Sequence, residues 1–90
     1  MATVNVTIEK GGWQDVIALG SLSLTENQVY TISVLASGVS EVCTASSKPE
    51  NTFRGHEATE KDNFAFTYKN EKIWVKLSPV AESTAIVVIS

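Results

Sequence analysis

The chain has 90 residues, of which 43% are hydrophobic and 19% charged, and its formal net charge is −3. This length predicts one domain, because independent cores typically need about 100–150 residues, and the composition excludes intrinsic disorder. The seven basic residues are outnumbered by ten acidic ones and form no run, so the sequence argues against a nucleic-acid partner. No apolar run approaches the ~20 residues that span a bilayer, and the start has no secretory signal pattern, so no membrane partner is expected.

Aliphatic and polar residues alternate over residues 4–9, which predicts a strand with one apolar face. Gly11 and Gly12 then break the strand. We therefore interpret residues 1–90 as a single β domain in which residues 1–12 form an N-terminal arm or an edge strand.

The next segments are short. Residues 13–19 could form a strand or one helical turn, and residues 25–28 form a polar turn. Residues 30–35 alternate and are joined by Ser37-Gly38 to residues 39–45, a pattern that predicts a β-hairpin.

The second half repeats this pattern. Residues 52–63 are rich in charge and are interpreted as a surface excursion. Residues 64–68 and 72–77 alternate on either side of a short turn, which predicts a second hairpin, and residues 84–89 form a last strand. Turn signals recur roughly every 8–12 residues, as expected for an all-β fold: an antiparallel β-sandwich or small barrel of about seven to eight short strands. The alternation predicts a shared core of Tyr30, Ile32, Phe64, Phe66, Ile73 and Val75.

The last strand is apolar on both faces, with Ile86 and Val88 on one side and Ala85, Val87 and Ile89 on the other. Only one face of a sheet can reach the core of a two-layer sandwich, so the other face is expected to meet a second subunit or another partner. We assign that role to Ala85, Val87 and Ile89, with the roles exchanged if the faces are reversed.

Two tryptophans are the most informative aromatic residues. Trp74 lies between Lys72 and Lys76 on the outer side of its strand, where it either packs under the lysine stems or extends the interface. We include it among the interface residues. Trp13 follows the glycine turn and is interpreted as a core residue in preference to a sugar-stacking platform.

Catalytic and metal-binding interpretations are weak. His56 has only Glu57 or Glu60 as nearby partners, fewer than the three or four ligands that a metal ion needs. Cys43, the only cysteine, can form no internal disulfide and is better explained as a small buried hydrophobe than as a nucleophile activated by His56. The acidic residues of the polar tract are better explained as a solubilising loop, so we expect no catalytic, cofactor-binding or metal-binding residues, and no enzyme activity.

Four segments taken in order resemble small all-β virion proteins of tailed bacteriophages. In that pattern a Trp-x-Asp segment precedes a Leu-Thr…Tyr-Thr-Ile strand, a loop bearing a proline follows, and an Ile-Trp-Val strand leads to an aliphatic terminal strand. The segments that carry the resemblance are Trp13-Gln14-Asp15-Val16-Ile17, Leu24-Thr25-Glu26-Asn27-Gln28-Val29-Tyr30-Thr31-Ile32, Lys72-Ile73-Trp74-Val75-Lys76 and Thr84-Ala85-Ile86-Val87-Val88-Ile89. One departure is the turn at residues 26–28, where the pattern usually carries a glycine.

The resemblance implies a structural or adsorption part of a phage particle: a capsid decoration protein, a head-fibre base or a small tail module. The expected function is a non-enzymatic decoration protein that binds and stabilises the capsid surface, made in the host cytoplasm and added to the virion. A homotrimer is expected, because local three-fold sites on an icosahedral shell repeat one contact three times. The partners are then a second copy of the chain and the major capsid protein. The alternative is a receptor- or glycan-binding module of a tail or fibre, with Trp13, Trp74 or Tyr68 stacking on sugars.

Overall fold

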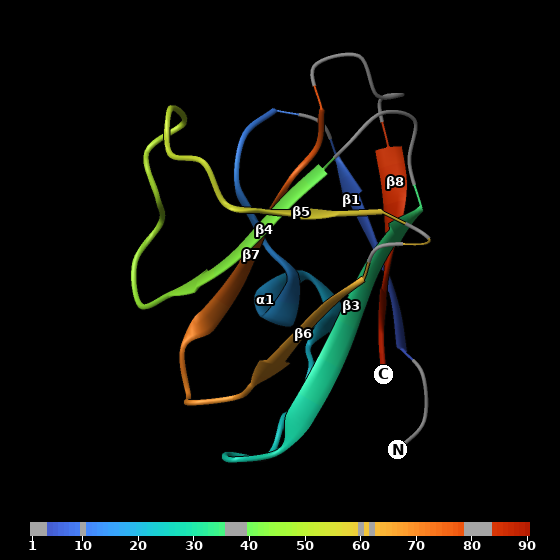
Figure 1. The fold of residues 1–90 in the computed structure, drawn as a ribbon, viewed down its shortest axis with the longest axis vertical. Coiled ribbons are helices and arrows are strands. Elements are labelled where there is room, and N and C mark those ends of the chain that lie inside the picture. The colour runs from blue at the N-terminus through green and yellow to red at the C-terminus, as the bar shows by residue number, and fades with distance from the viewer. Residues whose placement is uncertain (1–3, 10, 36–39, 60, 62, 79–83) are drawn as a thin grey trace.

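Two four-stranded antiparallel sheets pack face to face in the computed structural model (Figure 1). The model describes residues 4–9, 11–35, 40–59, 61, 63–78 and 84–90. This architecture confirms the all-β prediction and shows a sandwich. The described elements are β1 (Val4–Glu9), β2 (Gln14–Asp15), α1 (Val16–Gly20), β3 (Val29–Leu35), β4 (Ser40–Ala45), β5 (His56–Ala58), β6 (Phe64–Thr67), β7 (Lys72–Lys76) and β8 (Thr84–Ile89).

The first sheet has the strand order β1-β8-β3-β6, and the second has the order β2-β7-β4-β5. In the first sheet β8 lies between β1 and β3, with Val87 opposite both Val6 and Val34. In the second sheet β7 lies between β2 and β4, with Val75 opposite Gln14 and Val42. Strand β1 is an edge strand, so residues 4–9 lie at one border of the first sheet.

Both predicted hairpins are wrong. Strands β3 and β4 belong to different sheets, as do β6 and β7, so neither pair of strands forms a hairpin. A turn signal shows only that the chain reverses direction, whereas the pairing partner is chosen by long-range packing. The turn predicted at Ser37-Gly38 lies outside the described residues.

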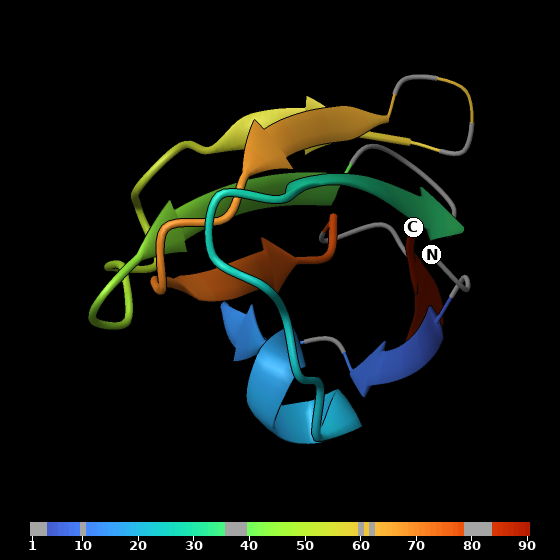
Figure 2. The same ribbon diagram turned by 90° about the horizontal axis from the view of Figure 1, so that it is seen from below.

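The ambiguous segment 13–19 contains both a short strand and a helical turn. Asp15 ends β2 and caps α1, because its Oδ1 accepts hydrogen bonds from the backbone N–H groups of Ile17 and Ala18, both at 3.2 Å. The helix packs against β1 and β7 and closes one side of the sandwich between the two sheets (Figure 2). Gly20 is needed there, since a Cβ atom would lie 2.7 Å from Cγ2 of Val6.

The core lies between the sheets and is almost entirely aliphatic. Of the six predicted core residues, Tyr30, Ile32, Ile73 and Val75 are buried, while Phe64 and Phe66 are half-buried against the same cluster. The two phenylalanines are less buried because β6 is an edge strand. The buried members of the core cluster are Val6, Ile8, Val16, Tyr30, Ile32, Val34, Val42, Ala58, Ile73, Val75, Leu77, Ala85, Val87 and Ile89.

The turn before β3 contains a residue in the left-handed region. Asn27 has a φ of 68°, in the left-handed region that asparagine tolerates better than most residues. Its backbone N–H donates to the carbonyl of Tyr68 at 2.8 Å, and its Oδ1 accepts from Nζ of Lys69 at 2.6 Å. Asn27 therefore supplies the conformation for which a glycine would otherwise be used.

Candidate functional site

The outer face of the first sheet, called here the open face, consists of the outward residues of β1, β8, β3 and β6. The strand register places Ile86 between Thr7 and Leu35, and Val88 between Asn5 and Ser33. Glu9, at the end of β1, is the one charged side chain among the described outward residues of these strands. The residues of the open face are Asn5, Thr7, Glu9, Val29, Thr31, Ser33, Leu35, Ala65, Thr67, Ile86 and Val88.

Several aliphatic side chains of the open face are strongly exposed. Val29 is 62% exposed, Ile86 40% and Leu35 39%. Single exposed aliphatic residues are ordinary, but here they lie on one sheet face whose one described charge is Glu9, and such grouped exposure marks interaction surfaces. In the sequence, the alternation of residues 84–89 is the pattern that places Ile86 and Val88 on one shared face of the strand.

The predicted assignment of the two faces of β8 is reversed. Ala85, Val87 and Ile89 are buried in the core of their own chain, and Val87 and Ile89 are fully inaccessible. They point inward because the register sets Val87 opposite two inward residues of the neighbouring strands. These three residues therefore form no interface, and the outward positions are Ile86 and Val88.

Trp74 is also not an interface residue. It lies on the outer side of the second sheet, as the sequence indicated, but only 6% of it is exposed, because it clusters with Trp13 and Cys43. Its Nε1 donates to the carbonyl of Ala45 at 3.1 Å, and Nζ of Lys72 lies 6.0 Å from the ring centroid. The interpretation as a tryptophan packed under neighbouring side chains is therefore the correct one.

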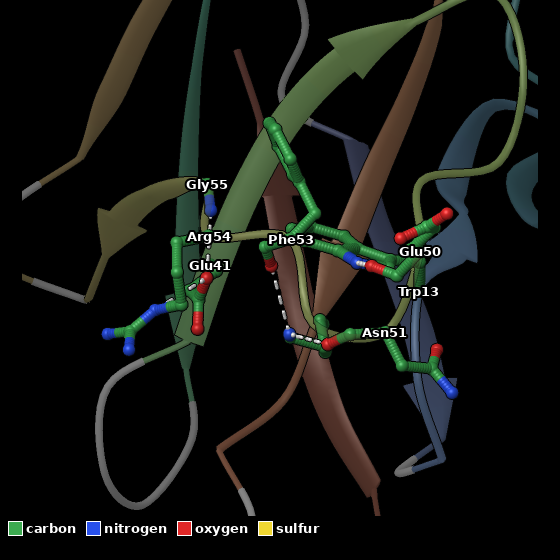
Figure 3. Close-up of polar contacts among 8 residues, drawn as sticks. Trp13, Glu41, Glu50, Asn51, Phe53, Arg54 and Gly55 are labelled. Atoms are coloured by element: carbon green, nitrogen blue, oxygen red, sulfur yellow. Dashed lines mark hydrogen bonds and ion pairs between the residues drawn. The ribbon is translucent and has the colours of Figure 1, made fainter.

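The loop of residues 46–55 lies against the outer face of the second sheet (Figure 3). Nε1 of Trp13 donates to the carbonyl of Glu50 at 3.0 Å, so the buried indole is fixed to the loop. Nζ of Lys76 lies 4.9 Å from the centroid of the Trp13 ring, which places the ammonium group over the aromatic face.

Lysine and glutamate side chains of the sheet hold the rest of this loop. Nζ of Lys76 donates to the carbonyls of Asn51 at 2.8 Å and Phe53 at 3.2 Å. Oε1 of Glu41 accepts from the backbone N–H of Gly55 at 2.8 Å (Figure 3). The loop backbone is thus positioned by side chains from β4 and β7, which fixes its tip.

A surface hollow of about 700 Å³ lies beside this loop. Its lining mixes polar and apolar surface and carries both signs of charge. Glu57 stands opposite Glu41 in the strand register, and the guanidinium Nε of Arg54 lies 3.6 Å from Oε1 of Glu41. The lining residues are Gly11, Gly12, Glu41, Asn51, Thr52, Arg54, Glu57, Lys76, Leu77 and Ser78.

A second hollow of about 290 Å³ adjoins the other side of residues 53–55. His56 stacks on Phe64 with 4.8 Å between the ring centroids and 22° between their planes. Phe53 is 49% exposed. Arg54 borders both hollows, and the lining residues of the second are Cys43, Thr44, Phe53, Arg54, Gly55, His56 and Phe64.

Residues 52–63 are not a simple surface excursion, because His56–Ala58 pair with β4 as strand β5. Ala58 is fully buried, while His56 and Glu57 are exposed. A short, charged edge strand is a common way to discourage pairing with other chains. Glu60 and Asp62 lie outside the described residues.

The geometry does not assemble a nucleophilic pair from Cys43 and His56. Cys43 shares the outer side of the second sheet with Trp74, whereas the imidazole of His56 packs on Phe64 of the other sheet. Burial raises the pKa of the Cys43 thiol, and the nearby Glu41 carboxylate raises it further, against an opposing effect of Lys76. A nucleophilic cysteine needs the opposite shift.

Within the described part of the chain, no three histidine, cysteine, aspartate or glutamate side chains gather where they could hold a metal ion. No helix in the same residues is long and apolar enough to cross a membrane. No protein-family model matches this chain, and neither the curated proteins nor the solved structures gave a match. A functional proposal therefore rests on the two outer faces and on the loop that covers one of them.

Proposed function

We propose that this protein is a non-enzymatic structural component of a bacteriophage particle, a decoration protein that binds the outer surface of the capsid through its open face. The observation that carries the proposal is the largely apolar open face, with Val29, Leu35 and Ile86 exposed on one sheet and Glu9 as its one described charge. The resemblance to small all-β virion proteins supplies the class of partner, the major capsid protein.

The distribution of charge supports a protein partner. The described charged side chains near the loop of residues 46–55 lie on the outer side of the second sheet, whereas the open face carries one described charge, Glu9, on its edge strand β1. Depletion of charge at the centre of a contact is typical of protein interfaces, whereas a nucleic acid or an anionic membrane would select basic residues. The open face therefore suits a neutral protein surface.

The size of the open face supports repeated copies. Four strands at about 4.8 Å spacing, each about six residues long on average at roughly 3.3 Å per residue, cover on the order of 400 Å². A standard interface buries about 800 Å² per partner, so one copy would bind weakly. A homotrimer at a three-fold site repeats the contact and gains avidity, which supports the trimer as the binding form.

Binding to capsids stripped of the protein tests the proposal. We expect wild-type protein to co-sediment with expanded capsids of the source phage, and Ile86→Glu to weaken binding at least about tenfold. Leu19→Glu is a matched control, because Leu19 is 55% exposed on α1 and lies away from the open face. Failure of the wild-type protein to bind, or equal binding by both variants, would contradict the proposal.

Sedimentation velocity tests the oligomeric state separately. We expect a trimer whose population rises with concentration or on the capsid. A chain that stays monomeric at high concentration and binds capsids with a one-to-one hyperbolic isotherm would contradict the trimer, while leaving the capsid contact intact.

A further inference from the structure

We propose that the loop of residues 46–55 forms a binding site for a neutral oligosaccharide, which occupies the two adjoining hollows on either side of Arg54. This site goes beyond the proposed capsid contact, because none of the residues that line the two hollows belongs to the open face. A decoration protein held by its open face would present this site to the solvent.

The second hollow supplies aromatic surface. Phe53 is 49% exposed, and the stacked pair of His56 and Phe64 borders the same hollow. Sugar rings present C–H faces that pack against aromatic rings. Trp13 and Trp74, considered for stacking from the sequence, are buried, so Phe53 is the residue that makes this contact. No sequence pattern indicated Phe53, because it is a lone aromatic residue in a polar loop.

The first hollow supplies hydrogen-bonding groups of the kind that sugar hydroxyls need. Glu41 and Glu57 offer carboxylate oxygens, which accept strong hydrogen bonds from hydroxyl groups, and Asn51 and Thr52 border the same hollow. Its volume of about 700 Å³ is in the range of small-molecule sites. Aromatic faces beside grouped polar side chains together match the chemistry of a carbohydrate.

The site is held in shape without a ligand. Lys76, Glu41 and Trp13 bind the loop through four hydrogen bonds to its backbone. Gly55 has no room for a side chain, since a Cβ atom would lie 2.7 Å from the carbonyl oxygen of Val42. A preorganised loop loses little entropy on binding, which favours weak ligands such as sugars.

The charges select a neutral sugar over an acidic one. Glu41 and Glu57 face each other across two strands, so an added carboxylate or phosphate would meet two negative groups. Lys76 is committed to two loop carbonyls and the Trp13 ring. Arg54 is the remaining cation of the lining and is paired with Glu41.

A glycan array followed by NMR titration of the folded protein tests the site. The probes for titration are cellotriose, maltotriose and chitotriose, with sialyllactose as the acidic comparison. We expect at least one neutral trisaccharide to shift the amide signals of residues 51–57 and to bind more tightly than sialyllactose.

Variants assign the binding to the two hollows. Phe53→Ala removes the stacking ring and Glu57→Gln removes a carboxylate acceptor, and each is expected to weaken binding at least about tenfold, whereas Phe53→Tyr keeps the ring and retains binding. Leu19→Ala on α1 is the matched control and should stay within about twofold. Circular dichroism verifies that each variant is folded.

Three results would overturn the site: no amide shift with any neutral probe together with an array without neutral hits, tighter binding of sialyllactose, or unchanged binding by both Phe53→Ala and Glu57→Gln. The capsid proposal fails by a different measurement. Ile86→Glu should bind the sugar as the wild type does while losing the capsid, so the two failures are distinguishable.

Discussion

The two sheets share one core, but their outer faces differ in how far the chain covers them. On the second sheet the outward side chains include Trp74, and the chain covers them with Trp13 and the loop of residues 46–55. On the first sheet the outward aliphatic residues, such as Val29 and Ile86, have no comparable cover among the described residues. An indole exposes far more apolar area than valine or isoleucine, so its own chain hides it.

This difference separates two kinds of outward apolar residue. The sequence pattern makes Trp74 an interface candidate. Burying its large apolar ring within the chain is strongly favourable, however, and only 6% of the residue is exposed. Ile86 and Val88 stand out less and remain accessible on the open face. The covered face thereby gains a polar loop with two hollows, while the open face keeps exposed aliphatic residues and a single described charge, Glu9. The first suits a small ligand and the second a protein surface.

The largest expected effect comes from placing a charged side chain on the inward face of β8. Val87→Glu places a carboxylate in the core, where Val87 is fully inaccessible, and we expect a loss of more than about 4 kcal/mol in unfolding free energy. Val88→Glu lies on the open face and should cost less than about 1 kcal/mol. Urea unfolding followed by circular dichroism compares the two, and equal midpoints would show that β8 does not present these faces.

Removing the cover of the second sheet has the next largest effect. Trp13→Ala leaves a cavity under the loop and deletes the hydrogen bond to the carbonyl of Glu50, so we expect a cost of about 3–5 kcal/mol. Trp13→Phe keeps most of the ring and should lose only about 1–2 kcal/mol. A Trp13→Ala protein as stable as the parent in urea would mean that the loop does not need the indole.

The strands could be predicted from the sequence because alternation is local. Their pairing could not, since the turn residues between β3 and β4 are equally compatible with a hairpin and with a crossing between sheets. Alternation also left the inward face of β8 undecided, because Val87 and Val88 are chemically equal and only the register with β1 and β3 separates them. The loop site needed side chains distant in sequence, Trp13 and Lys76, which no spacing rule connects to residues 46–55.

A smaller effect is expected from removing the hydrogen bonds that hold the loop of residues 46–55 while leaving the core packing intact. Lys76→Met keeps the aliphatic stem but removes the ammonium group from the carbonyls of Asn51 and Phe53 and from the ring of Trp13. We expect a loss of about 1–2 kcal/mol, and faster amide exchange at Phe53 and Gly55. Lys72→Met is the control, because Nζ of Lys72 lies 6.0 Å from Trp74 and holds no loop carbonyl. Equal amide exchange at Phe53 and Gly55 in both variants would contradict the role of Lys76 in holding the loop.

The smallest effect is a pH dependence confined to the covered face. Burial raises the pKa of the Cys43 thiol above its ordinary value of 9.0, with Glu41 adding to the shift and Lys76 opposing it. Above pH 9 the unfolded chain therefore loses this proton before the folded chain does, and the folded state binds more protons. The unfolding free energy contributed by Cys43 is fully present below pH 9 and is lost as the pH rises through the folded pKa.

Cys43→Ala isolates this contribution from the tyrosines and lysines that titrate in the same range. We expect urea midpoints of the wild type to fall more steeply between pH 8.5 and about pH 10 than those of the variant, because only the wild type must ionise a thiol beneath Trp74 and the loop. The open face contains no cysteine, tyrosine or lysine among its described residues, so Val88→Ser should leave the slope unchanged. Parallel slopes for wild type and Cys43→Ala would show that the thiol reaches solvent in the folded protein, and that the cover over the second sheet is looser than its hydrogen bonds indicate.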